Sequence, residues 1–158
     1  MTKPQLVLIP GAWHTPEAFS LIIPKLQSHD YSVHTRQLPA VDPSPTDPPT
    51  DLTKDVAAVR ELVIKAIDDG NDVVVVPHSW AGVVAGSALS GLGKVEREAK
   101  GEKGGVVRIA FMCSFIAPIG VGLLDAVEGQ LPDWWYADVC NPSCLDFHCY
   151  DTRTKIHP

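Results

Sequence analysis

Residues 73–82 read VVVVPHSWAG, and this stretch decides the fold that we expect. The four valines from Val73 to Val76 are β-branched and uninterrupted by charge, so they predict a buried strand. Small and apolar residues continue from Val83 to Leu89 and suit a closely packed helix. Ser79 is therefore expected on a sharp turn between a strand and a helix, with its hydroxyl raised above the edge of a sheet.

A serine in this position is typical of a nucleophile elbow. The start of the following helix favours negative charge that develops near the serine. The usual elbow pattern is G-x-S-x-G, whereas residues 77–81 read PHSWA and Gly82 follows. We expect Ala81 and Gly82 to let the strand and the helix approach closely. The alternative is an ordinary turn in which Ser79 is only the helix N-cap.

The composition excludes several classes of protein. A chain of 158 residues fits one domain with a sizeable core, and 45% hydrophobic residues argue against a disordered chain. The net charge of −6, with no basic cluster, argues against nucleic acid or an acidic membrane surface as the partner. No apolar run is long enough to cross a bilayer, and the N-terminal residues do not resemble a secretory signal. We therefore expect a cytoplasmic protein.

The cysteines do not predict a metal site. Three of them lie at positions 140, 144 and 149, near His148 and His157. Their C-x3-C-x4-C spacing lacks the close pairs that zinc sites use. We expect no metal, and since no motif indicates a nucleotide, no cofactor. Cys113 is expected to be a small buried side chain within an apolar strand.

The remaining elements alternate along the chain. Strands are expected at residues 5–9, 31–36 and 106–112, besides the one at 73–76. A helix should begin near Pro16 and be kinked at Pro24, and a second should run from a cap at Asp51 to Asp69. Val56, Val59, Val63 and Ile67 should form the buried face of that second helix. Residues 38–50, rich in proline, and residues 91–105, charged and rich in glycine, are expected to be loops.

This alternation predicts an α/β fold with a parallel sheet of about four strands, wound with helices on both faces. Right-handed crossovers favour the strand order 2-1-3-4. The chain then changes direction between the first and third strands, and ligands bind at such a point, beyond the carboxyl ends of the strands. The loops at residues 10–14 and 78–82 should meet there.

Four stretches carry a resemblance to a known family: LVLIPGAWHTPEAF (6–19), VVVVPHSWAGVVAGSAL (73–89), KGEKGGVVRIAFMCSFIAP (100–118) and VGLLDAVEGQLPDWW (121–135). With them the chain resembles the α/β-hydrolase superfamily, in the branch of small esterases, methylesterases and hydroxynitrile-lyase-like proteins, and especially its fungal members. The resemblance implies that residues 1–136 form the N-terminal half of that fold. Residues 137–158 show no helical or strand period and should be an irregular tail in place of the cap region.

The resemblance also implies roles for individual residues. Ser79 would be the nucleophile, and the backbone N–H groups of Ala12 and Trp80 would form the oxyanion hole. Such donors stabilise charge that develops in the transition state. Residues expected near the substrate are Gly11, Trp13, His14 and His78. Trp13 could instead be a core aromatic residue, and His78 is expected to support the elbow rather than act as the base.

A serine hydrolase of this family also needs an acid and a histidine, which follow the serine in the chain. The resemblance implies that the chain is truncated before both. His148 and His157 are the only histidines after Ser79 and are the candidate bases. The available acids are Asp125, Asp133, Asp138, Asp146 and Asp151.

The function implied by the resemblance is that of a serine esterase or thioesterase acting on a small ester, with secondary metabolism as a setting. Two alternatives stay open: a catalytically impaired remnant that binds a small molecule or a partner protein, and a lyase or cyclase on the same scaffold. No strand is expected beyond residues 106–112, so that edge of the sheet should be open. We expect a dimer through this edge, cover by the tail, or poor solubility.

Overall fold

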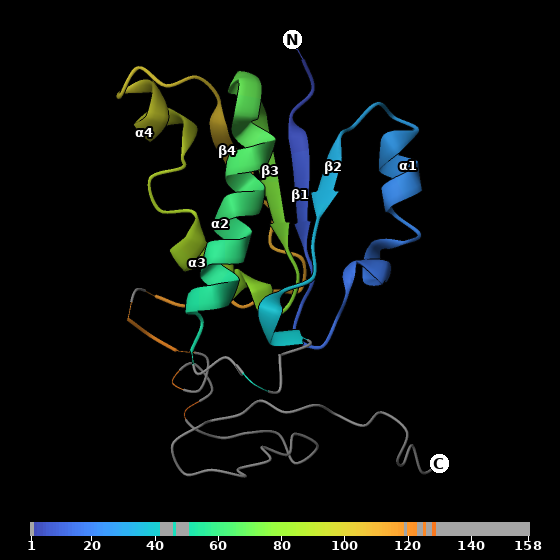
Figure 1. Ribbon diagram of the computed structural model, residues 1–158, viewed down its shortest axis with the longest axis vertical. Helices are drawn as coiled ribbons and strands as arrows, with labels where there is room; N and C mark the ends of the chain where they lie inside the picture. Colours follow the sequence, from blue (N-terminus) through green and yellow to red (C-terminus); the bar gives the residue numbers. More distant parts are fainter. Residues whose placement is uncertain are drawn as a thin grey trace.

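The computed structural model describes residues 2–41, 46, 51–118, 120–122, 125 and 128. The described strands form one parallel sheet in the order β2-β1-β3-β4, as predicted (Figure 1). The strands are β1 (Gln5–Ile9), β2 (Val33–Thr35), β3 (Asp72–Pro77) and β4 (Gly105–Ile109). β2 and β4 are shorter than expected, although an isolated bridge between His78 and Met112 continues the contact between β3 and the segment after β4.

Helical segments connect these strands, which confirms the α/β class. They are η1 (Pro16–Phe19), α1 (Ile23–Gln27), η2 (Pro39–Val41), α2 (Thr53–Ile67), η3 (Asp68–Gly70), α3 (Ala81–Ala88) and α4 (Lys94–Glu98). The loop predicted at residues 38–50 thus begins with a short 3-10 helix. The boundary expected between residues 136 and 137 lies outside the described residues.

The core lies between the sheet and the helices α2 and α3. Val59, Val63 and Ile67 of α2 are buried on the face that the sequence predicted, and Val56 packs against them. The β3 strand is less uniformly buried than its valines suggested. Val73 and Val75 face this core, whereas Val74 and Val76 point to the opposite face and are half-buried. Burial of β3 therefore alternates, as in a strand whose second face is less covered.

The first predicted helix is divided into two short pieces. The 3-10 helix η1 ends at Phe19, and α1 begins only at Ile23. Pro24 lies in the first turn of α1 rather than at a kink, because proline has no N–H to donate and is tolerated at a helix start. The start of α2 also differs slightly. Its N-cap is Leu52, but the Asp51 carboxylate still accepts a hydrogen bond from the N–H of Thr53 at 2.8 Å.

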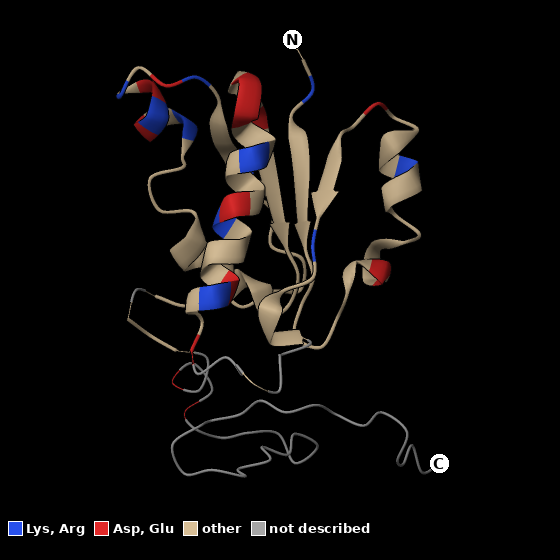
Figure 2. Cartoon of the chain, viewed as in Figure 1, with Lys and Arg blue, Asp and Glu red and all other residues tan. Residues whose placement is uncertain are grey.

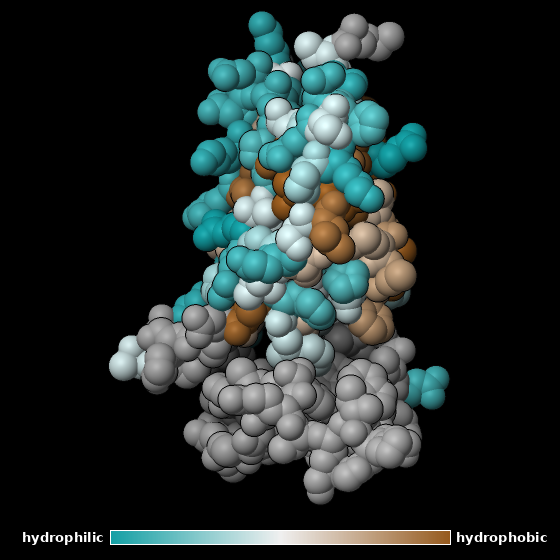
Figure 3. Space-filling model, turned by 90° about the vertical axis from the view of Figure 1, so that its right-hand side faces the viewer, coloured by the Kyte–Doolittle hydropathy of each residue, from teal (hydrophilic) through white to brown (hydrophobic). Residues whose placement is uncertain are grey.

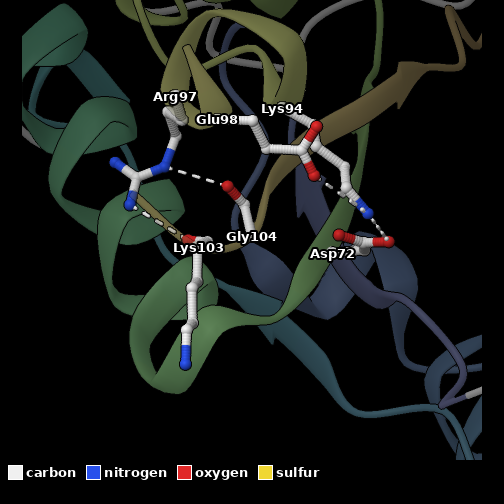
Figure 4. Close-up of polar contacts among 6 residues, drawn as sticks. All are labelled: Asp72, Lys94, Arg97, Glu98, Lys103 and Gly104. Atoms are coloured by element: carbon white, nitrogen blue, oxygen red, sulfur yellow. Dashed lines mark hydrogen bonds and ion pairs between the residues drawn. The ribbon is translucent and has the colours of Figure 1, made fainter. Parts of the chain in front are cut away.

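The charged segment predicted as a loop at residues 91–105 contains the helix α4. Polar contacts join this helix to its surroundings (Figure 4). Lys94 Nζ donates to Asp72 Oδ2 at 2.8 Å, and Arg97 Nε donates to the carbonyl of Gly104 at 3.0 Å. Charged side chains therefore attach α4 to the first residue of β3 and to the residue just before β4. The composition of residues 91–105 did not indicate these contacts.

Candidate active site

Ser79 lies two residues beyond β3 and two residues before α3, at the carboxyl edge of the sheet. Its φ angle is +55°, in the left-handed region that residues other than glycine seldom adopt. Such strain is characteristic of functional turns and persists only where the surroundings enforce it. The turn thus has the shape expected of a nucleophile elbow even though its sequence departs from the usual glycine pattern.

The segment that follows β4 holds this turn in place. The N–H of Ser79 donates to the carbonyl of Met112 at 3.3 Å, and the carbonyl of Ser79 accepts from the N–H of Phe115 at 3.1 Å. The hydroxyl of Ser114 donates to the same carbonyl at 2.6 Å. No sequence pattern indicated a role for Ser114. Its one available signal was a hydroxyl within an otherwise apolar run.

The close approach of residues 112–115 requires a glycine at position 82. A Cβ atom at this position would clash with the carbonyl oxygen of Phe115 and with Oγ of Ser114. Gly82 was expected to let β3 and α3 pack closely together. Instead, it leaves space for the segment after β4, because that segment crosses the first turn of α3.

The loop after β1 reaches the elbow at Gly11, as the predicted topology required. A Cβ atom at Gly11 would lie 2.9 Å from Cβ of Ser79 and 3.0 Å from Nδ1 of His78. Only glycine allows this approach without displacement of a neighbour. Gly11 was expected to lie near the substrate. Among the described residues, the close neighbours that require a glycine at this position are Ser79 and His78 of the turn itself.

Residues 11–14 form a tight turn. The N–H of His14 donates to the carbonyl of Gly11 at 3.2 Å. Trp13, the third residue, has a φ of +61°, whereas Ala12 has no positive φ, and this combination is typical of a type II turn. Trp13 is 39% exposed and is therefore not a core residue.

The backbone N–H groups of Ala12 and Trp80 flank Ser79 along the two loops. Among the hydrogen bonds between described residues, none uses either of these N–H groups, and none uses Oγ of Ser79. Two donors and a hydroxyl are thus brought to the same edge of the sheet without an internal partner in the described part of the chain.

His14 and His78 form a pair beside the elbow. Their rings meet edge to face, with centroids 5.6 Å apart. Burial lowers the pKa of His78, and the charge of His14 lowers it further. The His78 ring is therefore neutral at pH 7. Within the described residues the ring packs against Gly11 and His14 and makes no hydrogen bond, so its support of the elbow is steric.

The loops around Ser79 contain few ionisable side chains. Residues 10–16, 77–93 and 109–118 contain no Lys, Arg, Asp or Glu, and these loops are tan at the lower end of the sheet in Figure 2. The titratable side chains that they contribute are His14, His78 and Cys113. Cys113 is exposed rather than buried as expected, because β4 ends at Ile109 and the chain has left the sheet before residue 113.

The candidate acids and bases are described only in part. Asp125 accepts a hydrogen bond from the N–H of Gly122 at 2.8 Å, and this local contact does not direct it toward Ser79. The other candidates lie outside the described residues: Asp133, Asp138, Asp146, Asp151, His148 and His157. No three His, Cys, Asp or Glu side chains of the described residues are grouped so that they could hold a metal ion. No helix in the same part of the chain is long and apolar enough to span a membrane.

The family follows from a comparison of the whole chain. The model of the alpha/beta hydrolase family matches residues 6–148. The chain belongs to the alpha/beta hydrolase family. Among its relatives, the chain is 33% identical over 132 residues to the alpha/beta hydrolase nvfD of Aspergillus novofumigatus. It is 28% identical over 130 residues to the probable hydrolase R7 of a Phoma species.

These matches cover 84% and 82% of the chain but 51% and 50% of the two relatives. The chain thus spans about half the length of the curated relatives that it matches. Both relatives are fungal, in agreement with the resemblance noted in the sequence.

Proposed function

We propose that Ser79 is the nucleophile of a hydrolase that acts on a small carboxylic ester or thioester. The observation that carries this proposal is the strained turn at Ser79, which residues 112–115 hold by hydrogen bonds and which the loop of residues 11–14 approaches. Attack by Oγ would place a developing oxyanion near the N–H groups of Ala12 and Trp80. Loss of one such donor lowers the rate by about 10²–10³.

The substrate that we propose is uncharged. The three loops around Ser79 offer apolar and aromatic surface and no Lys, Arg, Asp or Glu to pair with an ionised group. His78, with its lowered pKa, adds no positive charge at pH 7. A carboxylate or ammonium group on the substrate would therefore lose hydration without gaining a partner from these loops.

The base that we propose is His148 or His157, which are the histidines after Ser79 in this chain. A second candidate function is ester binding without cleavage. It is favoured by the absence, among the described residues, of any acid or histidine hydrogen-bonded to Ser79. A lyase or cyclase has no comparable observation in its favour.

The experiment combines covalent labelling with turnover. An alkyl fluorophosphonate should label the purified chain at Ser79, identified by peptide mapping. Turnover of p-nitrophenyl butyrate should be lost in Ser79→Ala and should persist in Ser87→Ala, a matched change at an exposed serine of α3. One of the two variants His148→Ala and His157→Ala should remove the base. That variant should lower the rate as far as Ser79→Ala does, because the losses of rate from residues that act as a unit are not additive.

An unlabelled Ser79, with turnover equal in Ser79→Ala and Ser87→Ala, would contradict the hydrolase proposal. Retained binding of the butyrate ester under those conditions would then establish the second candidate. Equal turnover in both histidine variants and the unmodified chain would show that neither His148 nor His157 is the base.

A further inference from the structure

We infer that His14 is a positioning residue that fixes the loop carrying the candidate oxyanion donor, Ala12. This inference rests on the proposed function for its catalytic meaning. Its structural content rests on contacts of His14 alone. His14 donates two hydrogen bonds within its own turn, and each one holds a different peptide group.

The first bond comes from the backbone. The N–H of His14 donates to the carbonyl of Gly11 at 3.2 Å. This carbonyl belongs to the peptide group whose N–H is that of Ala12. The peptide is trans, so its C=O and N–H point in opposite directions. By holding the oxygen of Gly11, His14 therefore directs the N–H of Ala12 away from the interior of the turn.

The second bond comes from the imidazole ring. Nδ1 of His14 lies 2.8 Å from the carbonyl oxygen of Ala12. A carbonyl oxygen only accepts hydrogen bonds, so Nδ1 carries the proton and donates it. This bond holds the peptide group between Ala12 and Trp13. The two peptide groups on either side of the Ala12 Cα are thus both fixed by one residue.

This double attachment opposes the strain of the turn. A positive φ at a residue other than glycine costs about 1–3 kcal/mol and must be enforced by the surroundings. Trp13 has such a φ, at +61°, between the peptide group whose carbonyl the His14 ring holds and the peptide group that carries the His14 N–H. The His14 ring is itself placed by its edge-to-face contact with His78, 5.6 Å between centroids, and His78 directly precedes Ser79. The loop and the elbow are therefore aligned through adjacent rings.

Two substitutions separate the ring bond from ring packing. His14→Phe keeps an aromatic ring beside His78 and keeps the backbone N–H, but removes the Nδ1 donor. His14→Asn restores a donor, because its amide nitrogen is as many bonds from Cα as Nδ1 is. We expect Ala12 and Trp13 to be rigid in the unmodified chain and in His14→Asn, with backbone order parameters near about 0.85. In His14→Phe they should fall below about 0.6.

The test is made on the full 15N-labelled chain by relaxation of the Ala12 and Trp13 amides. Nitrogen shifts of the His14 ring give its tautomer, and protonated Nδ1 in the neutral ring is expected. Unchanged order parameters in His14→Phe, or a neutral ring protonated only at Nε2, would overturn the inference. The tautomer is read from the unmodified chain, so this arm decides even if a variant does not fold.

Turnover provides a separate arm. If Ser79 is the nucleophile, His14→Phe should lower kcat about tenfold, less than outright loss of an oxyanion donor, with KM unchanged and the rate recovered in His14→Asn. A loss of rate in His14→Phe that His14→Asn does not restore would also count against the inference. If instead Ser79→Ala leaves turnover unchanged, the hydrolase proposal fails, while the relaxation and tautomer measurements still decide the role of His14.

Discussion

Asp55 is a carboxylate buried within the core, and it makes stability depend on pH. Its side chain is 1% exposed. Oδ1 accepts a hydrogen bond from the N–H of Ala40 at 3.0 Å, whereas Oδ2 has no partner among the described residues. Burial raises the pKa of Asp55, and the bond from Ala40 opposes part of that rise. An acid whose pKa is higher in the folded state stabilises the fold less as the pH rises above its unfolded pKa.

Asp55→Asn keeps an oxygen for Ala40 and removes the ionisation. We expect the free energy of unfolding of this variant to rise relative to the unmodified chain from about pH 4 toward neutrality, by about 1.4 kcal/mol per unit of pKa difference. Urea unfolding at several pH values measures this, with Asp30→Asn at an exposed carboxylate as control. A difference that does not change with pH would contradict the expectation.

At the scale of the elements, α3 carries two glycines with opposite requirements. Gly82 meets the segment after β4, whereas a Cβ at Gly86 would meet nothing within 4 Å. Gly86→Ala should therefore stabilise the chain by about 0.5–1 kcal/mol through helix propensity. Gly82→Ala should destabilise it by about 1–3 kcal/mol, because the carbonyl of Phe115 must move. Thermal unfolding of the two variants tests this. Equal shifts of their midpoints would show that the segment after β4 makes no close contact with α3 at Gly82.

The same element shows how far the sequence could predict the site. Ser79, its turn and the loop at Gly11 followed from local patterns and the strand order, because each pattern is contiguous and the parallel topology brings the loops together. Ser114 could not be predicted, since its contact with Ser79 depends on where the chain goes after β4 ends. The helix α4 was also missed, because it buries no apolar face and is instead joined by ion pairs to Asp72 in β3 and to Glu102 in the loop that follows it.

At the scale of the whole molecule, the edge formed by β4 remains the feature that the sequence predicted to be open. Val107 and Ile109 are 44% and 37% exposed, and Phe111 and Ile116 continue the apolar surface. A groove of about 260 Å³ runs along this strand between Leu89, Glu96 and Val107. Figure 3, a view from the side of β2, shows a second apolar area on its right, on the face that points away from the viewer in Figure 1. We propose that two copies associate through β4. Val107→Lys should lower the association constant at least tenfold, because a charged side chain on an edge strand opposes pairing. Leu21→Lys is the control, at a residue 84% exposed just before α1, a helix that contacts β2 at the opposite edge of the described sheet. Sedimentation velocity over a range of concentrations decides it, and a monomer at all concentrations would contradict the proposal.

The attachment of Ser79 to residues 112–115 also has a consequence for synthesis of the chain. The hydroxyl of Ser114 and the N–H of Phe115 hold the carbonyl of a residue made 35 and 36 positions earlier, respectively. While a ribosome has released only the chain through α3, the serine has its helix but not the bonds that impose its φ of +55°. The nascent protein therefore acquires a strained serine only after β4 and the residues beyond it have left the exit tunnel. Until then, the backbone of Ser79 is under no more constraint than that of any other serine in an unfinished polypeptide.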